Sequence, residues 1–189
     1  MKKYLFVLLT FSLLIISSGC KEKLPVITEL SNKTYLLINQ DELEIQFPQK
    51  YKGNIVIIGY IFTRCPDICP MTTHNMYLVE QKLLEEGIDD VVFINLSFDP
   101  DTDSPAVLKD YGRIRGLDFN RWEFLTGNRN EISSILKEVD VYAIADTTYY
   151  EDGRKDYYYI HTDRISLIDQ NGNVRRDYSG STIEVNEII

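Results

Sequence analysis

The chain has 189 residues and a formal net charge of -9, with 29 acidic side chains against 20 lysines and arginines. This length suits one domain of ordinary size with a hydrophobic core of its own. The acidic balance argues against nucleic acid as a partner, because phosphate backbones bind basic surfaces. The chain has three cysteines, too few for a framework of disulfides that would hold a small fold together.

The first residues have the pattern of an export signal. Met1-Lys2-Lys3 is followed by an apolar run from Tyr4 to Ile16 and then by Ser17-Ser18-Gly19-Cys20. A basic start, a short apolar segment and small residues are typical of such signals. The apolar run is shorter than the about 20 residues that a membrane span needs.

Ser18-Gly19-Cys20 is similar to the cleavage site of bacterial lipoproteins, in which the cysteine is lipidated and becomes the new N-terminus. We therefore predict a signal peptide at 1–19, cleaved before a lipidated Cys20, then a polar tether at 20–33 and a domain at 34–189. The alternative is an uncleaved anchor with Cys20 as a spare thiol. Either interpretation predicts an exported domain tethered to a membrane and facing the periplasm or the cell exterior.

The first half of the domain alternates between strand and helix patterns. Residues 35–38 and 43–47 predict a hairpin, and the apolar runs at 55–62 and 91–98 predict strands buried on both faces. Between these two strands, apolar residues at helical spacing predict a helix that ends at Gly87. The two buried strands should therefore be parallel, with a right-handed crossover.

The second half continues the same alternation. Ser104 and Pro105 predict the start of a helix, Trp122–Gly127 reads as a short edge strand, and 130–139 as a helix. We expect Trp122 to serve packing. Asp152-Gly153 is a strong turn signal for an exposed hairpin. Residues 165–175 predict two strands joined by a tight turn, and residues 183–188 a short last helix.

Cys65 and Cys69 occupy the junction between the strand at 55–62 and the helix that follows it. Pro66 suits the first turn of that helix, which would put Cys65 near the N-cap and Cys69 one turn further on the same face. Free N–H groups and the helix dipole favour a thiolate there. Two such sulfurs can bind one soft cation or form a disulfide, and the spacing leans towards a metal.

The sequence Phe62-Thr63-x-Cys65-Pro66-Asp67-x-Cys69-Pro70 resembles the signature of the Sco/SenC family, thioredoxin-like copper proteins that help assemble cytochrome c oxidase. The resemblance continues at Asp99-Pro100, at Asp103-x-Pro105 and at His161, and covers the chain from Leu36 to Gly180. It implies an α/β, thioredoxin-like fold with a central mixed β-sheet flanked by helices. An N-terminal hairpin and an inserted hairpin before the last strands would complete it.

The resemblance also implies a third metal ligand, because His161 stands where the family has its metal-binding histidine, on a loop facing the cysteine helix. Two thiolates and one imidazole suit Cu(II), and Cys65 and Cys69 alone suit Cu(I). Zn(II) would also accept this set with a water molecule. The second histidine, His74, lies well off the face of Cys69 on the predicted helix, so we expect it on the surface.

Two further groups of polar residues have a structural and a functional interpretation. We expect the aspartates 99, 101 and 103 to cap a strand end rather than bind a metal ion, because their spacing is not that of a calcium loop. In Sco-like proteins this loop lies near the cysteines, so Asp99 is a candidate to tune the site. The tyrosines around the predicted turn at Asp152 are expected to pair across the strands, with a docking face for a partner as the alternative.

Taken together, these residues predict a membrane-tethered copper metallochaperone with Cys65, Cys69 and His161 as ligands. The resemblance implies that its partner is subunit II of cytochrome c oxidase, which it supplies with copper. The rival interpretation is an enzyme, a thiol–disulfide oxidoreductase that reduces the acceptor's cysteines with Cys65 and Cys69. A copper or redox sensor that binds without delivering is the third, and the sequence does not separate it from a chaperone.

Overall fold

The computed structural model describes residues 24–153 and 155–188. The signal peptide predicted at 1–19 and the lipidation predicted at Cys20 lie outside these residues. Within the described ranges, no helix combines the length and the apolar character needed to cross a bilayer.

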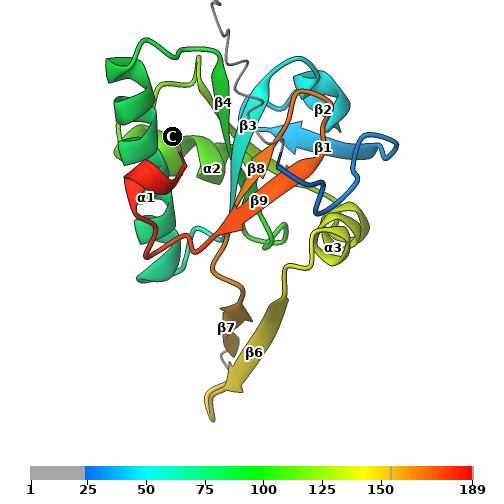
Figure 1. Ribbon diagram of the computed structural model, residues 1–189. Helices are drawn as coiled ribbons and strands as arrows, with labels where there is room; N and C mark the ends of the chain where they lie inside the picture. The colour runs from blue at the N-terminus through cyan, green and yellow to red at the C-terminus, as the bar shows by residue number, and fades with distance from the viewer. Residues whose placement is uncertain (1–23, 154, 189) are drawn as a thin grey trace, which may run out of the picture.

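The centre of the fold is a seven-stranded mixed sheet with the strand order β2-β1-β5-β4-β3-β8-β9 (Figure 1). The strands are β1 Tyr35–Asn39, β2 Glu44–Phe47, β3 Ile55–Ile61, β4 Val91–Ser97, β5 Trp122–Gly127, β8 Ile165–Ile168 and β9 Val174–Tyr178. β3, β4 and β5 run parallel, and the remaining neighbours pair antiparallel. The predicted α/β fold with a central mixed sheet is confirmed.

The two runs predicted to be buried on both faces are the central strands β3 and β4. Six of the seven residues of β3 are buried, and β4 pairs with it in parallel along its whole length. The prediction for β5 as an edge strand was wrong, because β5 lies between β4 and β1. Trp122 of β5 is fully buried and stacks on Phe93 with ring centroids 5.0 Å apart, which confirms its packing role.

Three α-helices of the described chain cover the sheet, with α1 and α2 on one face and α3 on the other (Figure 1). They are α1 Ile68–Glu85, α2 Pro105–Ile114 and α3 Arg129–Glu138. Each begins at a polar cap whose side chain accepts from a backbone N–H of the first turn, namely Asp67, Ser104 and Asn128. α1 buries Met76, Val79 and Leu83 and ends before Gly87, as its apolar spacing predicts.

The inserted hairpin consists of β6 Ala143–Tyr149 and β7 Lys155–His161 and projects from the body of the molecule (Figure 1). These strands form a sheet of their own and pair with no strand of the main sheet in the described chain. The expected pairing of tyrosines across the hairpin was wrong. Tyr157, Tyr158 and Tyr159 lie opposite Thr147, Asp146 and Ala145. Tyr157 and Tyr159 instead contact each other along β7.

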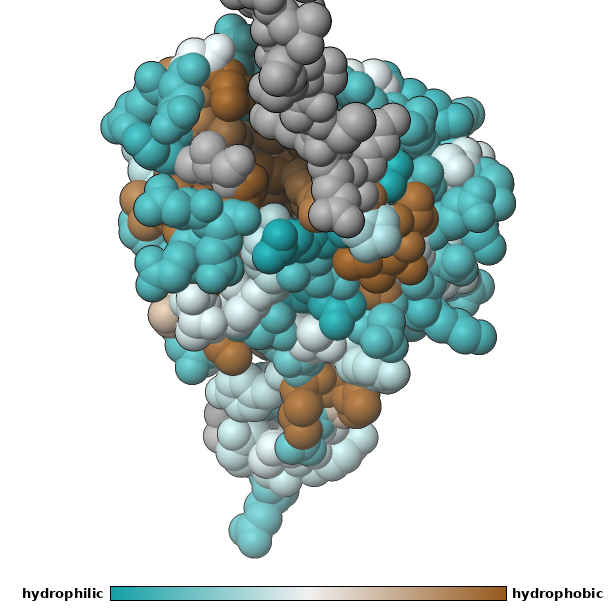
Figure 2. All heavy atoms as spheres, in the orientation of Figure 1, coloured by the Kyte–Doolittle hydropathy of each residue, from teal (hydrophilic) through white to brown (hydrophobic). Residues whose placement is uncertain are grey.

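One face of the hairpin is open to solvent. Ile144 and Ile160 lie opposite each other in register and are 62 % and 68 % exposed. Figure 2 shows an apolar patch on the hairpin, within a surface that is mostly hydrophilic. The other face of β7 turns towards the body of the molecule, and this is the face that builds the candidate site.

The described chain begins with a segment that contacts the start of β9, the strand at one edge of the sheet. The amide of Ile27 donates to the carbonyl of Val174 over 2.8 Å, and the Asn173 side chain accepts from the amides of Leu30 and Ser31. Part of the segment expected to be a tether therefore packs on the sheet. At the other end, the helix predicted at 183–188 is a single 3-10 turn, Val185–Glu187.

Candidate metal centre

Cys65 and Cys69 lie beside each other where β3 ends and α1 begins. α1 starts at Ile68 with Asp67 as its cap, two residues later than Pro66 predicts, because the Asp67 carboxylate takes the first free amide over 2.6 Å. Cys65 therefore lies in the turn before the helix, and Cys69 is its second residue. The amide of Cys69 donates to Sγ of Cys65 over 3.4 Å. The two sulfurs still converge, although only one belongs to the helix.

His161 is the last residue of β7 and faces these sulfurs. Its Nδ1 lies 3.0 Å from the carbonyl oxygen of Thr162, and its Nε2 lies 3.8 Å from Sγ of Cys69. Because a carbonyl only accepts, Nδ1 must carry the proton in this contact, which leaves the lone pair of Nε2 directed at the sulfur. The histidine lies on a strand end rather than in the loop that the resemblance implies.

The ligand atoms of Cys65, Cys69 and His161 lie within 4.8 Å of one another. Metal–sulfur and metal–nitrogen bonds of about 2.3 Å and 2.0–2.1 Å separate neighbouring ligand atoms by about 3.5–4 Å in a tetrahedral or trigonal site. The observed spacing therefore suits one ion with little movement. Among the described residues, this is the group of cysteine, histidine and carboxylate side chains with a metal-binding geometry.

Aromatic rings enclose the imidazole. The ring of His161 lies 5.9 Å from that of Phe62 and 5.0 Å from that of Phe98, centroid to centroid. Tyr159 packs on the same two phenylalanines at 5.2 Å each. Phe62 and Phe98 follow β3 and β4 directly, so the ends of the central strands form the wall behind the site. This wall restricts the orientations open to the imidazole.

Burial changes the protonation expected for the cysteines. Both are free thiols with buried side chains, Cys69 fully and Cys65 with 7 % exposure. Burial raises the pKa of the Cys69 thiol above its ordinary value. The thiolate that the helix dipole favours is thus not the ground state of Cys69, because desolvation outweighs the dipole. A metal ion that binds this sulfur must displace its proton.

Buried carboxylates hold the backbone around the site. Asp103 accepts from the amide of Thr63 over 3.0 Å, from its hydroxyl over 2.5 Å and from the hydroxyl of Ser97 over 2.6 Å. Burial raises the pKa of the Asp103 carboxyl. Asp99 accepts instead from tyrosines of β7. Neither aspartate is part of the ligand group, and the helix that follows is capped by Ser104.

Sequence reasoning missed Asp163, which lies two residues after His161. Its Oδ1 accepts from the hydroxyl of Thr72 over 3.2 Å, and Thr72 lies three residues after Cys69 in α1. The Asp163 carboxylate also accepts from the amide and hydroxyl of Ser181. This contact joins the histidine segment to the cysteine helix. Its only local signal in the sequence is the closeness of Asp163 to His161.

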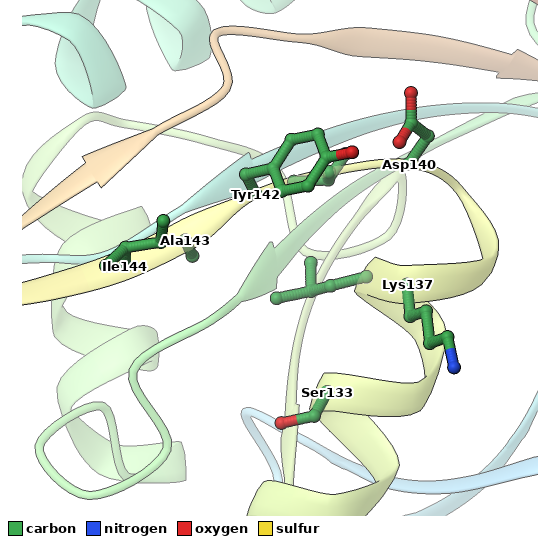
Figure 3. Close-up of a pocket in the computed structure, with 8 residues that line it drawn as sticks. Ser133, Lys137, Asp140, Tyr142, Ala143 and Ile144 are labelled. Carbon is green, nitrogen blue, oxygen red and sulfur yellow. The ribbon is translucent and has the colours of Figure 1, made fainter.

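A hollow on the described surface is lined by residues of α3 and β6 and by none of the three candidate ligands (Figure 3). A cavity of about 510 Å³ opens between the end of α3 and the start of β6 and is lined by Leu136, Val141, Tyr142 and Ile144, among others. No cysteine or histidine lines it. His74 is exposed on α1, as expected, and the ligand group found among the described residues does not include it.

A mixed sheet whose central strand leads into a cysteine-bearing helix, with a histidine brought against the two sulfurs, defines a thioredoxin-like protein with a candidate centre for a soft metal. The chain belongs to the SCO1/SenC family, which matches residues 27–189. The SCO1 protein homolog of Bacillus subtilis is 34% identical over 174 residues, which make up 91% of this chain and 84% of that relative.

Solved structures of the family have the same fold. A SCO1/SenC family lipoprotein from Bacillus anthracis is 31% identical with a TM-score of 0.70, over 89% of this chain and 94% of that one. Arabidopsis thaliana ScoI with copper bound is 26% identical with a TM-score of 0.70, over 82% and 91%. BsSco, a member of the Sco family of cytochrome c oxidase assembly proteins in which a disulfide switch is described, is 28% identical with a TM-score of 0.69, over 88% and 94%. The predicted thioredoxin-like fold is confirmed.

Proposed function

We propose that this protein is a copper metallochaperone that assists assembly of the copper site of cytochrome c oxidase, with Cys65, Cys69 and His161 as copper ligands. The observation that carries the proposal is the convergence of two sulfurs and one imidazole nitrogen within 4.8 Å. The copper bound to the Arabidopsis relative and the assembly role of BsSco support the choice of metal and pathway.

The three ligands suit two oxidation states of copper. Cys65 and Cys69 supply the soft sulfur donors that Cu(I) prefers, and the imidazole of His161 completes a set for Cu(II). Nε2 of His161 lies 3.8 Å from Sγ of Cys69, so it can join or leave the ion through a small movement. Copper is the cargo in this proposal, and the oxidation state decides how many ligands hold it.

Delivery would go to subunit II of cytochrome c oxidase. Acceptor thiolates would replace Cys65 and Cys69 one at a time on Cu(I), with no change of oxidation state. Cys65 and His161 are the ligands that keep some exposure to solvent, whereas Cys69 is fully buried. We therefore expect Cys69 to release copper last.

The proposal includes a tether. A signal peptide at 1–19, lipidation of Cys20 and a short tether would hold the domain at the membrane outside the cytoplasm, and the lipoprotein from Bacillus anthracis supports this arrangement. Tethering raises the effective concentration of a donor near a membrane-bound acceptor. Labelling of cells with a radioactive fatty acid, comparing wild type with Cys20→Ala, tests it, and equal labelling of both would contradict lipidation at Cys20.

The site is tested by titrating the reduced soluble domain, without oxygen, with Cu(I) and with Cu(II) separately. We expect the wild-type domain to bind one copper ion per chain, whether Cu(I) or Cu(II) is added. The His161→Ala variant should lose far more affinity for Cu(II) than for Cu(I). Cys65→Ala should bind neither Cu(I) nor Cu(II) tightly. Stoichiometric copper binding by this variant would refute the assignment of Cys65 as a ligand. A parallel titration with Zn(II) shows whether zinc competes for the same ligands.

A thiol–disulfide oxidoreductase is the second candidate, and the disulfide switch described for BsSco favours keeping it. The buried thiol of Cys69, whose pKa is raised, is a poor attacking nucleophile, so Cys65 would have to attack. A domain that binds no copper tightly but reduces disulfides catalytically would replace the chaperone with this enzyme. Tight copper binding without transfer to the subunit II copper domain would favour a sensor.

A further inference from the structure

The strand that carries His161 presents three side chains to the body of the molecule. Successive side chains of a strand point to opposite faces, so Tyr157, Tyr159 and His161 share one face of β7. Tyr158 and Ile160 point the other way and are 55 % and 68 % exposed. Whatever fixes the two inward tyrosines therefore also fixes the direction of the imidazole.

Both inward tyrosines donate to one buried carboxylate. The hydroxyl of Tyr157 lies 2.9 Å and 2.8 Å from the two oxygens of Asp99, and the hydroxyl of Tyr159 lies 3.3 Å from Oδ1. Asp99 has no exposed surface, and the hydroxyl of Thr102 is a further donor to it. A buried carboxylate needs such donors, since leaving it unpaired is costly. Hydrogen bonds to a charged acceptor are also among the stronger ones.

Tyr157 also joins β7 to the cysteine segment. The guanidinium of Arg64, the residue before Cys65, lies 4.3 Å from the centre of the Tyr157 ring. Arg64 is also ion-paired with Asp156 at 3.6 Å. One tyrosine thus contacts the loop after β4 through its hydroxyl and the cysteine turn through its ring.

The backbone gives the hairpin little other support in this orientation. β6 and β7 pair only with each other in the described chain. At the base, the amide of Thr162 donates to the carbonyl of Tyr142, which closes the hairpin on itself. The position of β7 against the body therefore depends on side-chain contacts, among which the tyrosine bonds to Asp99 are directional.

We propose that Asp99, Tyr157 and Tyr159 form a latch that positions Nε2 of His161 against the cysteine sulfurs. The inference rests on the proposed copper function, and the three latch residues are positioning residues that contact no ligand atom. With the latch intact, the imidazole is held ready as the third ligand. With the latch broken, the two sulfurs remain in place on α1 and its preceding turn, but the histidine is no longer aligned.

The test removes hydroxyl groups and keeps the rings. Tyr157→Phe/Tyr159→Phe deletes both tyrosine donors to Asp99, and Tyr149→Phe/Tyr158→Phe makes the same chemical change on tyrosines of the hairpin that do not contact Asp99. We expect the first variant to bind Cu(II) about 10–100-fold more weakly, the range found when residues that orient metal ligands are changed. Its thiolate–Cu(II) absorption band should weaken, whereas its Cu(I) affinity stays that of wild type. The control variant should match wild type in Cu(II) affinity, in the thiolate–Cu(II) absorption band and in Cu(I) affinity.

A measurement without copper separates the latch from the function. Hydrogen exchange of the apo protein should be faster in β6 and β7 of the latch variant and unchanged in β3 and β4. Unchanged exchange in the hairpin, together with wild-type Cu(II) binding, would overturn the latch. Equal losses of Cu(I) and Cu(II) would also overturn it, since they mean general damage to the site. Failure of wild type to bind copper would refute the proposed function, and the exchange result would still decide the latch.

A milder variant covers the case in which the double variant does not fold. Tyr157→Phe leaves Asp99 with the hydroxyls of Tyr159 and Thr102, so its carboxylate keeps donors. We expect a smaller loss in the same direction, confined to Cu(II) and to exchange in the hairpin. Wild-type values for both in a folded Tyr157→Phe protein would argue that Tyr157 has no positioning role.

Discussion

Sγ of Cys69 lies 3.8 Å from Nε2 of His161, although 92 positions separate the two residues in the chain. Each residue reaches this point through a different element, the cysteine at the start of α1 and the histidine at the end of the β6–β7 hairpin. The contact is therefore a product of the tertiary structure. Variants that affect one side chain, its protonation or its support should separate their contributions.

The first prediction concerns the buried sulfur. Cys69→Ser replaces a soft donor by a hard one in the same position, so Cu(I) should lose much of its preference for the site. Changes to residues that only support a metal ligand usually cost about 10–100-fold in affinity. Because Cys69 is itself a proposed ligand, we expect a larger loss of Cu(I) affinity. Competition with a chelator of known Cu(I) affinity measures it. His74→Ala, which alters an exposed histidine of the same helix, is the control and should bind as wild type does.

The second prediction concerns pH and the stability of the apo protein. Burial raises the pKa of Cys69 in the folded state, so folding favours the protonated thiol. The resulting stabilisation of the folded state is fully present at pH values below the ordinary thiol pKa of 9.0. Above that value the unfolded chain loses its proton first, so stability should fall as pH rises from 9 to 10. One such group contributes a slope of up to about 1.4 kcal/mol per pH unit.

Urea unfolding of the reduced apo protein at pH 8, 9 and 10 checks this expectation. Cys69→Ala should be less stable at pH 8 because of the cavity it leaves, but its stability should decline less between pH 9 and pH 10. Parallel curves for wild type and variant would show that the thiol titrates as an ordinary one.

The third prediction concerns a buried ion pair under the sheet. Nε of Arg121 lies 3.0 Å from Oε1 of Glu80, and the indole N–H of Trp122 donates to Oε2 over 2.9 Å. Arg121→Met leaves the Glu80 carboxylate buried without its cation, which should cost about 3–5 kcal/mol of unfolding free energy. Chemical denaturation followed by circular dichroism measures it.

An exposed pair supplies the matched control. Lys109 pairs with Asp41 over 2.8 Å with side chains 52% and 43% exposed, so Lys109→Met should cost no more than about 1 kcal/mol. If both variants lost the same stability, burial would not be the reason for the effect at Arg121.

The fourth prediction concerns the segment that leads into Cys65. Asp103→Asn replaces one acceptor oxygen by an N–H donor opposite the Thr63 and Ser97 groups that Asp103 now accepts from. Leaving such buried groups unpaired should cost about 1–3 kcal/mol, measured by urea unfolding at pH 7. Asp101→Asn makes the same change two residues away on a side chain that is 65% exposed, and it should be close to neutral. The reverse order of effects would contradict a supporting role for Asp103.

Much of the fold follows from local patterns. The uninterrupted apolar runs of β3 and β4 and the glycine after α1 are read from neighbouring residues, because burial on both faces and helix termination leave local signals. The position of β5 is not local. β5 lies between β1 and β4 because it pairs with segments that are distant in the chain. The sequence of a short strand bounded by polar turns is similar whether the strand lies at an edge or in the centre of a sheet.

The candidate site divides in the same way. Cys65, Cys69 and His161 were predicted from the motif and the resemblance, and the structure brings their ligand atoms together. The start of α1 was misplaced because Pro66 and Asp67 are both good starting residues, and the Asp67 cap bond decides between them. The contacts of Tyr157 with Asp99 and of Asp163 with Thr72 were missed because each joins segments more than 50 residues apart.

The contacts of residues 27–31 with Asn173 and Val174 fix the point at which the N-terminal segment leaves the domain. β8 runs antiparallel to β3, so the turn that holds this segment lies at the beginning of β3, whereas Cys65 follows its end. The seven residues of β3 span about 20 Å at 3.3 Å per residue. If the chain were fixed to a bilayer through Cys20 as proposed, Cys65, Cys69 and His161 would lie at the end of the domain remote from the lipid. An acceptor in the same membrane would have to present its own site at that height above the bilayer.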